Sequence, residues 1–330
     1  MLPAPASSKD GQPGTDAAQP NGPTGARPCR VVAIGGGKGG SGKSLVAASL
    51  GIELARRGIR VVLVDCDLGG PNLHSLLGME YPREALSDFV LRRVPRLEDV
   101  VVATPIAGLA LVSGARNALA VANPLYQQKM RLMRALRRLD TDIVVLDLGA
   151  GTHNTVVDFF LLAHFGVLVV VPEPTSVENA YRFLKAAFLR RLASVNEPAG
   201  IRELLQEAMR SRAHAPLSPA ELVAAATERD PALGDALAQS LALFRPMLLI
   251  NQVREAKDLS LGEGIVAATR RLFGLDLTGL GSLAYSDQVW RAVRAHQPVA
   301  FDQLDTAFTA EIGVVAARLL QVTSITEVER

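Results

Sequence analysis

Residues 37–44, GKGGSGKS, fit the spacing G-x-x-x-x-G-K-[ST]. Glycines let the main chain turn successive N–H groups toward phosphate oxygens, and a helix that starts inside the loop adds the positive end of its dipole. In this pattern Lys43 neutralises the β- and γ-phosphates, and the Ser44 hydroxyl ligates Mg²⁺. The pattern therefore predicts a site for a nucleotide and Mg²⁺. Its loop residues are Gly37, Lys38, Gly39, Gly40, Ser41, Gly42, Lys43 and Ser44.

Carboxylates follow two apolar runs. Asp65 and Asp67 lie in VDCDLGGPN, and Asp147 lies in VVLDLGAGT, with Gly149 and Gly151 just after it. Asp65 and Asp67 are two residues apart on an extended segment and point to the same side. Two unpartnered carboxylates repel each other unless a cation lies between them, although one aspartate alone could simply cap a turn. The pair therefore indicates a metal or phosphate site.

Short apolar runs alternate with helical patterns and should position these groups. A strand is expected at 30–34, a helix at 43–58 and a second strand at 60–67. Further strands are expected at 109–114, 142–149, 166–173, 246–253 and 277–285. The runs are apolar on consecutive positions, which is typical of strands covered on both faces. We therefore predict an α/β fold with a doubly wound, mostly parallel sheet flanked by helices, whose ligands bind at the carboxyl ends of the strands.

Two regions depart from this alternation. Residues 1–28 are rich in Pro, Gly, Ala and Ser, and we expect a disordered tail ahead of one domain at 29–330. Residues 191–245 contain no strand pattern and are predicted to be a helical insertion. Within it, Ser218, Pro219 and Glu221 form the pattern of a capping box at a helix start. The insertion either thickens one face of the domain or carries a partner site.

The composition excludes several classes of protein. The net charge is +2, which gives no general indication of nucleic acid or membrane binding. The two cysteines, Cys29 and Cys66, form no C-x-x-C motif, which disfavours a zinc site, an iron–sulfur site and a disulfide framework. No apolar run approaches the roughly 18 residues of a membrane-spanning helix, and the N-terminus does not have the pattern of a secretory signal. We expect a cytoplasmic protein.

Lys38 is a second lysine in a loop that needs only one. The segment KGGSGKS resembles the deviant Walker A motif K-G-G-x-G-K-[ST] of the MinD/ParA ATPases. In that family the additional lysine reaches across a dimer interface to the ATP of the partner subunit. The resemblance therefore implies ATP and Mg²⁺ as ligands, ATP hydrolysis, and a homodimer in the ATP state with Lys38 acting in trans.

The same resemblance implies roles for other residues. Asp65 would hold Mg²⁺ through water, and Asp67 would position or activate the attacking water. Asn72 matches the switch I asparagine. Asp147 matches the Walker B aspartate and would support Mg²⁺, while the glycines after it form switch II. Asn251 corresponds to an asparagine that reads the adenine edge; the alternative use of its side chain is an Asx turn.

The segments VVPEPTSVENAYRFLK (170–185) and LGSLAYSDQVWRAVRAHQPV (280–299) resemble the FlhG/FleN group of MinD-like ATPases, which regulate flagellar number and position. Ala284 and Ser286 depart from the P-Y-D element of that group. The C-terminus is apolar enough for a packing helix and does not have the basic face of a membrane-targeting helix. The expected function is an ATP-dependent dimerisation switch used for positioning or number control, recruited to a pole, the nucleoid or the inner membrane surface.

The sequence does not identify the partner. A protein partner is expected but not identified, and an ATP-gated regulator could bind a transcription factor through 191–245. A ParA-type partition ATPase would bind DNA nonspecifically. The cations of the helix around QQKMRLMRALRRLD favour a solvated helix face over a phosphate-binding surface; they are Lys129, Arg131, Arg134, Arg137 and Arg138. Arg291 and Arg294 near Trp290 could widen such a patch only if the fold brings the two helices together.

Overall fold

The computed structural model describes residues 29–67, 70–114, 124–193, 200–201, 203, 218–295 and 306–325. The predicted tail at 1–28 and most of 194–217 lie outside this part of the chain. Eight strands form one sheet in the order β3-β4-β2-β5-β1-β6-β7-β8. Their bounds are β1 Arg30–Gly35, β2 Val61–Cys66, β3 Val102–Ala103, β4 Leu109–Val112, β5 Ile143–Leu148, β6 Phe165–Val170, β7 Met247–Val253 and β8 Thr278–Ala284.

The sheet is parallel except at one edge, where β3 pairs with β4 in the antiparallel direction. Seven strands were predicted and all seven are present. The eighth, β3, was not predicted because its two residues are too few to give an apolar run. The predicted doubly wound, mostly parallel sheet is therefore confirmed, with a short antiparallel strand added.

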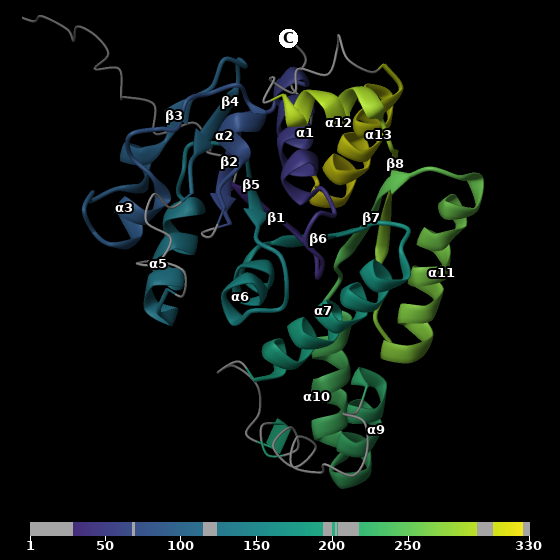
Figure 1. Cartoon of the computed structure of the whole chain (residues 1–330). Helices are drawn as coiled ribbons and strands as arrows, with labels where there is room; N and C mark the ends of the chain where they lie inside the picture. The colour runs from purple at the N-terminus through teal and green to yellow at the C-terminus, as the bar shows by residue number, and fades with distance from the viewer. Residues whose placement is uncertain are drawn as a thin grey trace, which may run out of the picture.

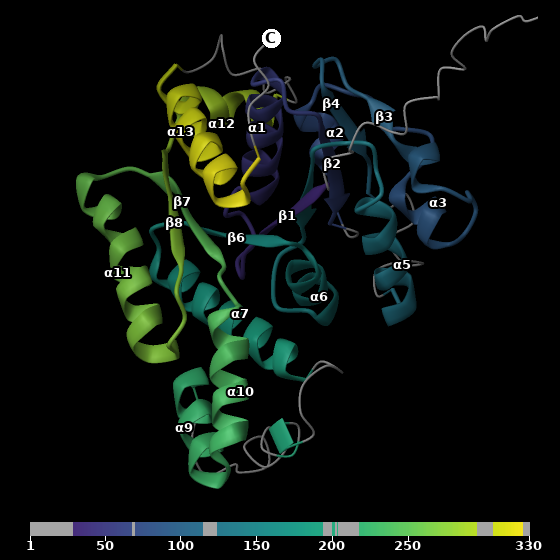
Figure 2. The same ribbon diagram turned by 180° about the vertical axis from the view of Figure 1, so that it is seen from behind.

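Helices cover both faces, and each face has its own apolar core (Figures 1 and 2). One face carries α1 (Lys43–Arg56), α2 (Leu73–Leu76), α12 (Asp287–Arg294) and α13 (Thr306–Thr323). The other carries α3 (Leu86–Val90), η1 (Leu97–Val100), α5 (Tyr126–Leu136), α6 (Asn154–Leu162), α7 (Pro174–Leu192) and α11 (Ala256–Phe273). Helices α9 (Pro219–Arg229) and α10 (Pro231–Ala242) pack beyond α7.

The described part of the insertion is helical, as predicted. Ser218 Oγ accepts the N–H of Glu221 at 3.2 Å, and Glu221 Oε2 accepts the N–H of Ser218 at 2.6 Å, so the capping box is confirmed. Helices α9 and α10 approach closely because residue 234 is glycine: a Cβ there would lie 2.1 Å from Thr227 Oγ1. Leu237 is fully buried in the core beneath them, so these helices extend the core on the α7 side.

The C-terminal helix α13 is a packing helix, as predicted. Its apolar side, which includes Ile312, Ala316 and Leu319, is buried against α1 and β8. Arg57 donates to the carbonyl of Gly313 at 2.8 Å, and Arg318 donates to the carbonyl of Leu280 at 3.1 Å. In the described part of the chain, no helix has both the length and the apolar character that crossing a membrane requires.

Candidate functional site

The segment 37–44 follows the carboxyl end of β1 and includes the first two residues of α1, Lys43 and Ser44, as the motif requires. Gly42 is the N-cap of α1, and no side chain caps the N–H groups of this helix end. Gly42 has φ +84°, a left-handed conformation that favours glycine. Gly37 lies against α7, where a Cβ would lie 2.2 Å from the carbonyl oxygen of Asn179. Both glycines are therefore needed for the path of the loop.

The two lysines of the loop have different environments. Lys43 is buried and its Nζ donates to the carbonyl of Lys38 at 3.1 Å. Burial lowers the pKa of Lys43, while Asp147 and Asp67 act in the opposite direction. Lys38 points outward, with a side chain 31% exposed, and forms an ion pair with Glu173 at the start of α7. One lysine thus turns into the loop and the other away from it.

The predicted carboxylates meet at the carboxyl ends of neighbouring strands. Asp65 of β2 pairs in register with Asp147 of β5, and Ile34 of β1 pairs with Asp147 on its other side. Asp67 lies beside switch II, since a Cβ on Gly149 would be 3.3 Å from Asp67 Oδ1. The sheet therefore brings all three carboxylates to the edge from which the phosphate loop departs.

Asp65 is held by backbone donors. Its Oδ1 accepts the N–H of Asp67 at 3.1 Å, and its Oδ2 accepts those of Asn72 at 2.8 Å and Leu73 at 3.2 Å. Burial raises the pKa of Asp65 to about 6, against the lowering effect of these hydrogen bonds. The carboxylate thereby holds the backbone of Asp67 and that of Asn72 and Leu73 at the start of α2. The sequence did not indicate this use of Asp65.

Asp147 is the buried acid without such support. Both of its carboxylate oxygens are buried, and neither makes a hydrogen bond of normal geometry. Burial, followed by the charge of Asp65, raises the pKa of Asp147 well above its usual range, although the nearby Ser44 hydroxyl and Lys43 act to lower it. A buried carboxylate of this kind costs free energy unless a cation offsets it.

These residues fit Mg²⁺ that is bound together with a nucleotide. The described residues contain no cluster of three or more His, Cys, Asp or Glu side chains able to hold a metal alone. Magnesium is usually bound by one or two carboxylates together with substrate phosphates and water. Ser44, Asp65 and Asp147 are the predicted residues for it, and the unpartnered oxygens of Asp147 are the observation that supports this assignment.

Residues at the end of β7 hold the phosphate loop. Asn251 is buried and its Nδ2 donates to the carbonyl of Ser41 at 2.9 Å. Gln252, with φ +59°, donates from Nε2 to the carbonyl of Gly40 at 3.3 Å. A Cβ on Gly42 would lie 2.4 Å from Asn251 Nδ2, so the amide packs directly on the loop. The predicted contact of Asn251 with adenine stays a prediction. In this structure the amide holds the phosphate loop through its hydrogen bond to Ser41.

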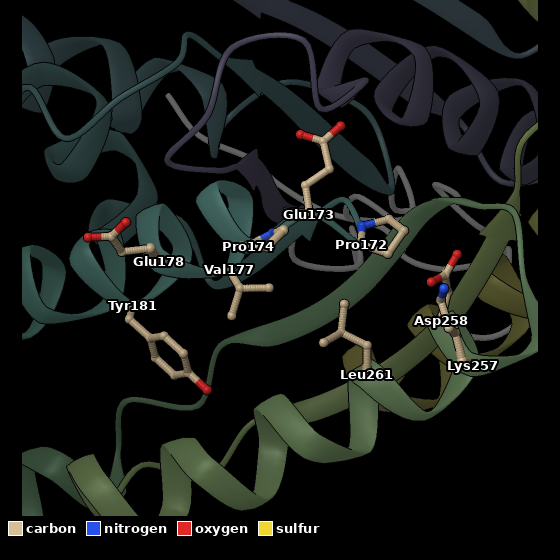
Figure 3. A pocket seen from close by; sticks show the side chains of 9 residues that line it. All are labelled: Pro172, Glu173, Pro174, Val177, Glu178, Tyr181, Lys257, Asp258 and Leu261. Atoms are coloured by element: carbon tan, nitrogen blue, oxygen red, sulfur yellow. The ribbon is translucent and has the colours of Figure 1, made fainter.

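A mostly apolar pocket of about 580 Å³ opens next to the Lys38–Glu173 pair. Figure 3 shows Pro172, Glu173 and Tyr181 lining it from the β6–α7 side, and Leu261 lining it from α11. The Tyr181 ring stacks on Phe273 with centroids 5.7 Å apart. The sequence reasoning missed both features. The pocket forms where α7 approaches α11, and the Glu173 pair forms where the start of α7 lies beside the phosphate loop.

Helix α5 does not present all of its cations to solvent, whereas the interpretation of a solvated helix face had predicted that it would. Lys129 is buried and donates to Asp158 Oδ2 at 2.7 Å. Arg131 stacks on Phe89 at 4.1 Å from the ring centroid, and Arg137 donates to the carbonyl of Leu162 at 2.7 Å. These cations are used within the fold because α5 packs on α3, η1 and α6. Helix α12, with Arg291 and Arg294, lies apart from α5 in both views (Figures 1 and 2) and does not widen its charged face.

A family model for ParA proteins, described as NUBPL iron-transfer P-loop NTPase, matches residues 28–193, just over half of the chain. The antiactivator FleN of Pseudomonas aeruginosa is 37% identical over 160 residues, which are 48% of this chain and 56% of FleN. A putative septum site-determining protein MinD of Nephroselmis olivacea is 31% identical over 155 residues, 47% of this chain and 56% of that protein. The matches span little more than half the length of these relatives.

Solved structures extend the similarity of fold beyond the matched sequence. The septum site-determining protein MinD from Pyrococcus horikoshii, complexed with Mg-ADP, has a TM-score of 0.61 at 18% identity, covering 90% of this chain and 98% of that one. The Pyrococcus furiosus cell division ATPase MinD has a TM-score of 0.60, also at 18% identity, covering 89% and 99%. With the phosphate loop, its two lysines and the family match, the chain belongs to the ParA family of P-loop NTPases, in which FleN and MinD are relatives.

Proposed function

We propose that this protein is an ATPase that binds Mg·ATP, forms a homodimer in the ATP state and hydrolyses ATP slowly, and that the cycle serves the positioning or number control of a cellular structure. The observation that carries the proposal is the division between the two lysines of one loop. Lys43 is buried against the loop, whereas Lys38 is partly exposed and points away from it. An outward cation beside a nucleotide is suited to contact a second subunit.

In one subunit the chain would hold the nucleotide as follows. Lys43 and the uncapped N–H groups of α1 bind phosphate oxygens, and Ser44 and Asp147 hold Mg²⁺, with Asp65 fixing the segment that carries Asp67. Magnesium supplies charge neutralisation at the β- and γ-phosphates when it is bound. Asp67 lies beside switch II, and we propose that it orients the attacking water or accepts a proton from it.

The proposed dimer would add Lys38 of each subunit to the nucleotide of the other. A cation delivered in trans makes the charge at the γ-phosphate stabilise the dimer, and it couples loss of that phosphate to dissociation. Glycines at 149 and 151 let switch II move when the phosphate leaves. We further propose that a protein partner reads the dimer and that the protein acts in the cytoplasm, recruited to a pole, the nucleoid or the inner membrane surface.

The first experiment measures molecular mass by size exclusion with light scattering, in Mg·ADP and in Mg·ATP, for the wild type and Asp67→Ala. We expect Asp67→Ala to bind ATP, fail to hydrolyse it and accumulate as a dimer in ATP alone. Lys43→Ala should lose nucleotide binding, and Lys38→Ala should bind ATP but neither dimerise nor hydrolyse it. A constant mass for Asp67→Ala despite confirmed ATP binding would refute the dimer, and hydrolysis retained by Lys38→Ala would refute the trans role.

A further inference from the structure

A second cavity lies at the amino ends of β6, β7 and β8, whereas the phosphate loop lies at the carboxyl end of β1. It has a volume of about 400 Å³ and lies at the first residues of β6 and β8, Phe165 and Thr278, and at Pro246 just before β7. The phosphate loop follows the carboxyl end of β1, which runs parallel to β6. A ligand in this cavity would therefore not compete with the nucleotide for space.

The charged groups that line the cavity are cationic. Arg191, near the end of α7, donates from Nε to Ser240 Oγ at 3.3 Å, and Arg245 donates from Nε to the carbonyl of Ala242 at 3.0 Å. In the described part of the chain neither guanidinium forms an ion pair with an acid, and no described Asp or Glu lines the cavity. Their terminal amino groups therefore remain available to an anion.

His164 adds a neutral donor. Its Nδ1 accepts the N–H of Val31 at 2.9 Å, which places the proton of the neutral ring on Nε2. Burial, with the charges of Arg137 and Arg30, lowers the pKa of His164 and keeps the ring neutral at physiological pH. The Thr278 hydroxyl lies in the same lining. The cavity thus combines two cations with two neutral groups that can donate hydrogen bonds.

Apolar side chains form part of the rim of the cavity. Leu243 is 73% exposed and Val322 is 39% exposed, so both offer apolar surface to a ligand. A cavity of this size, with a partly apolar rim and a few polar groups, has the character of a small-molecule site. A ligand that fits it carries an anionic group for the arginines and an apolar part for the rim.

We propose that this cavity binds a small phosphate monoester with an apolar organic group, independently of the ATP site. A phosphate monoester offers three acceptor oxygens and close to two negative charges, which matches two guanidiniums and two neutral donors better than the single charge of a carboxylate. The site is composed of residues from α7, the α10–β7 connection, the start of β8 and the loop before β6.

Isothermal titration calorimetry tests this on the full chain loaded with Mg²⁺ and a non-hydrolysable ATP analogue, so that the phosphate loop is filled. The probes are phenyl phosphate, inorganic phosphate and benzoate in a phosphate-free buffer. We expect phenyl phosphate to bind most tightly and benzoate least. Arg191→Gln and Arg245→Gln should each weaken phenyl phosphate at least tenfold, since each removes charged hydrogen bonds, and Arg271→Gln, an exposed arginine of α11, should not.

Several outcomes would overturn the proposal. Absence of binding heat for phenyl phosphate, unchanged binding in the folded arginine variants, or tighter binding of benzoate would each do so. If Arg191→Gln fails to fold, the more exposed Arg245→Gln still provides the comparison. A Lys43→Ala protein that still binds phenyl phosphate separates this cavity from the phosphate loop, so failure here leaves the proposed ATPase cycle unaffected.

Discussion

Lys38 and Glu173 form an ion pair although they are 135 positions apart in the chain. The pair joins the outward lysine of the phosphate loop to the N-cap of α7 within one subunit. If Lys38 acts on the nucleotide of a second subunit, it must leave Glu173 first. The pair therefore opposes dimerisation by the free energy of one partly exposed ion pair in each subunit, which is about 0–1 kcal/mol per pair.

Glu173→Gln should strengthen the ATP-dependent dimer. Removing the carboxylate leaves Lys38 without its partner in the same subunit. Because both subunits of the dimer lose this pair, the dissociation constant should fall by up to about thirtyfold. Analytical ultracentrifugation in Mg·ATP, in the background of Asp67→Ala, measures this constant. Glu178→Gln is the matched control, because Glu178 lines the same pocket but pairs with Arg182. A weaker dimer in Glu173→Gln would show that the carboxylate supports the interface instead.

Asn251→Ala should weaken every nucleotide to a similar degree. The buried amide donates to the carbonyl of Ser41, so its removal loosens the loop that holds the phosphates, at a cost of about 1–3 kcal/mol. An adenine-reading role would instead reduce the preference for ATP over GTP. Fluorescent ATP and GTP analogues measure both constants. Gln252→Ala removes the more exposed hydrogen bond to the carbonyl of Gly40 and should weaken the affinity for both nucleotides to a smaller degree.

The sequence predicted the parts of the site that are encoded locally. The loop spacing, the strand before it and the helix that starts at Lys43 lie within one short segment, and the carboxylates follow apolar runs that were predicted as strands of one mostly parallel sheet. The structure confirms these strands and adds that β2 and β5 are neighbours, with Asp65 and Asp147 in register. Sequence patterns within single strands and helices were therefore sufficient to predict the elements that carry the site.

The parts that were not predicted depend on packing between distant segments. The partner of Lys38, the hydrogen bond from Gln252 and the burial of Lys129 each join residues from different elements. A cation in a helical pattern gives no indication of the acid that it will meet, because that depends on how the helices cross. The use of Asp65 by three backbone N–H groups was likewise not visible, since the turn after β2 determines which N–H groups face it.

Asp158→Ala should destabilise the fold without changing nucleotide affinity. Asp158 accepts from Lys129 at 2.7 Å and from Arg190 at 2.8 Å, and thereby joins α5, α6 and α7 in an ion triad whose Lys129 and Asp158 are buried and whose Arg190 is partly exposed. Its removal leaves the buried Lys129 without an acid, a loss of about 3 kcal/mol in the free energy of unfolding.

Urea unfolding measures the change, and Arg134→Ala, on the exposed side of the same helix, should cost less than about 0.5 kcal/mol. Burial alone would raise the pKa of Asp158, but Arg190 and Lys129 hold it below its usual value. The stability from this triad is therefore lost as the pH falls through that lowered pKa. Unchanged unfolding of Asp158→Ala would show that the triad is energetically neutral.

The nucleotide-free and metal-free protein should lose stability as the pH rises from about 4 to 7. Burial raises the pKa of Asp65 from 3.8 to about 6, and it raises that of Asp147 in the same direction. For an acid whose pKa is raised by folding, the stabilising contribution is full below the unfolded pKa and is lost as the pH rises through the folded pKa. The Asp65 part of this loss is at most about 2–3 kcal/mol.

Thermal unfolding in EDTA at pH 4.5, 6 and 7 measures this decline, and the comparison is of slopes because Asp65→Asn also alters hydrogen bonds. Asp65→Asn should flatten the slope, whereas Asp235→Asn, an exposed position on α10, should leave it unchanged. Mg·ATP should reverse part of the decline in the wild type, since a cation between the carboxylates favours their ionised form. If the slopes of the wild type and Asp65→Asn coincide, ionisation of this buried carboxylate does not destabilise the nucleotide-free protein, and the electrostatic argument for a cation beside it fails.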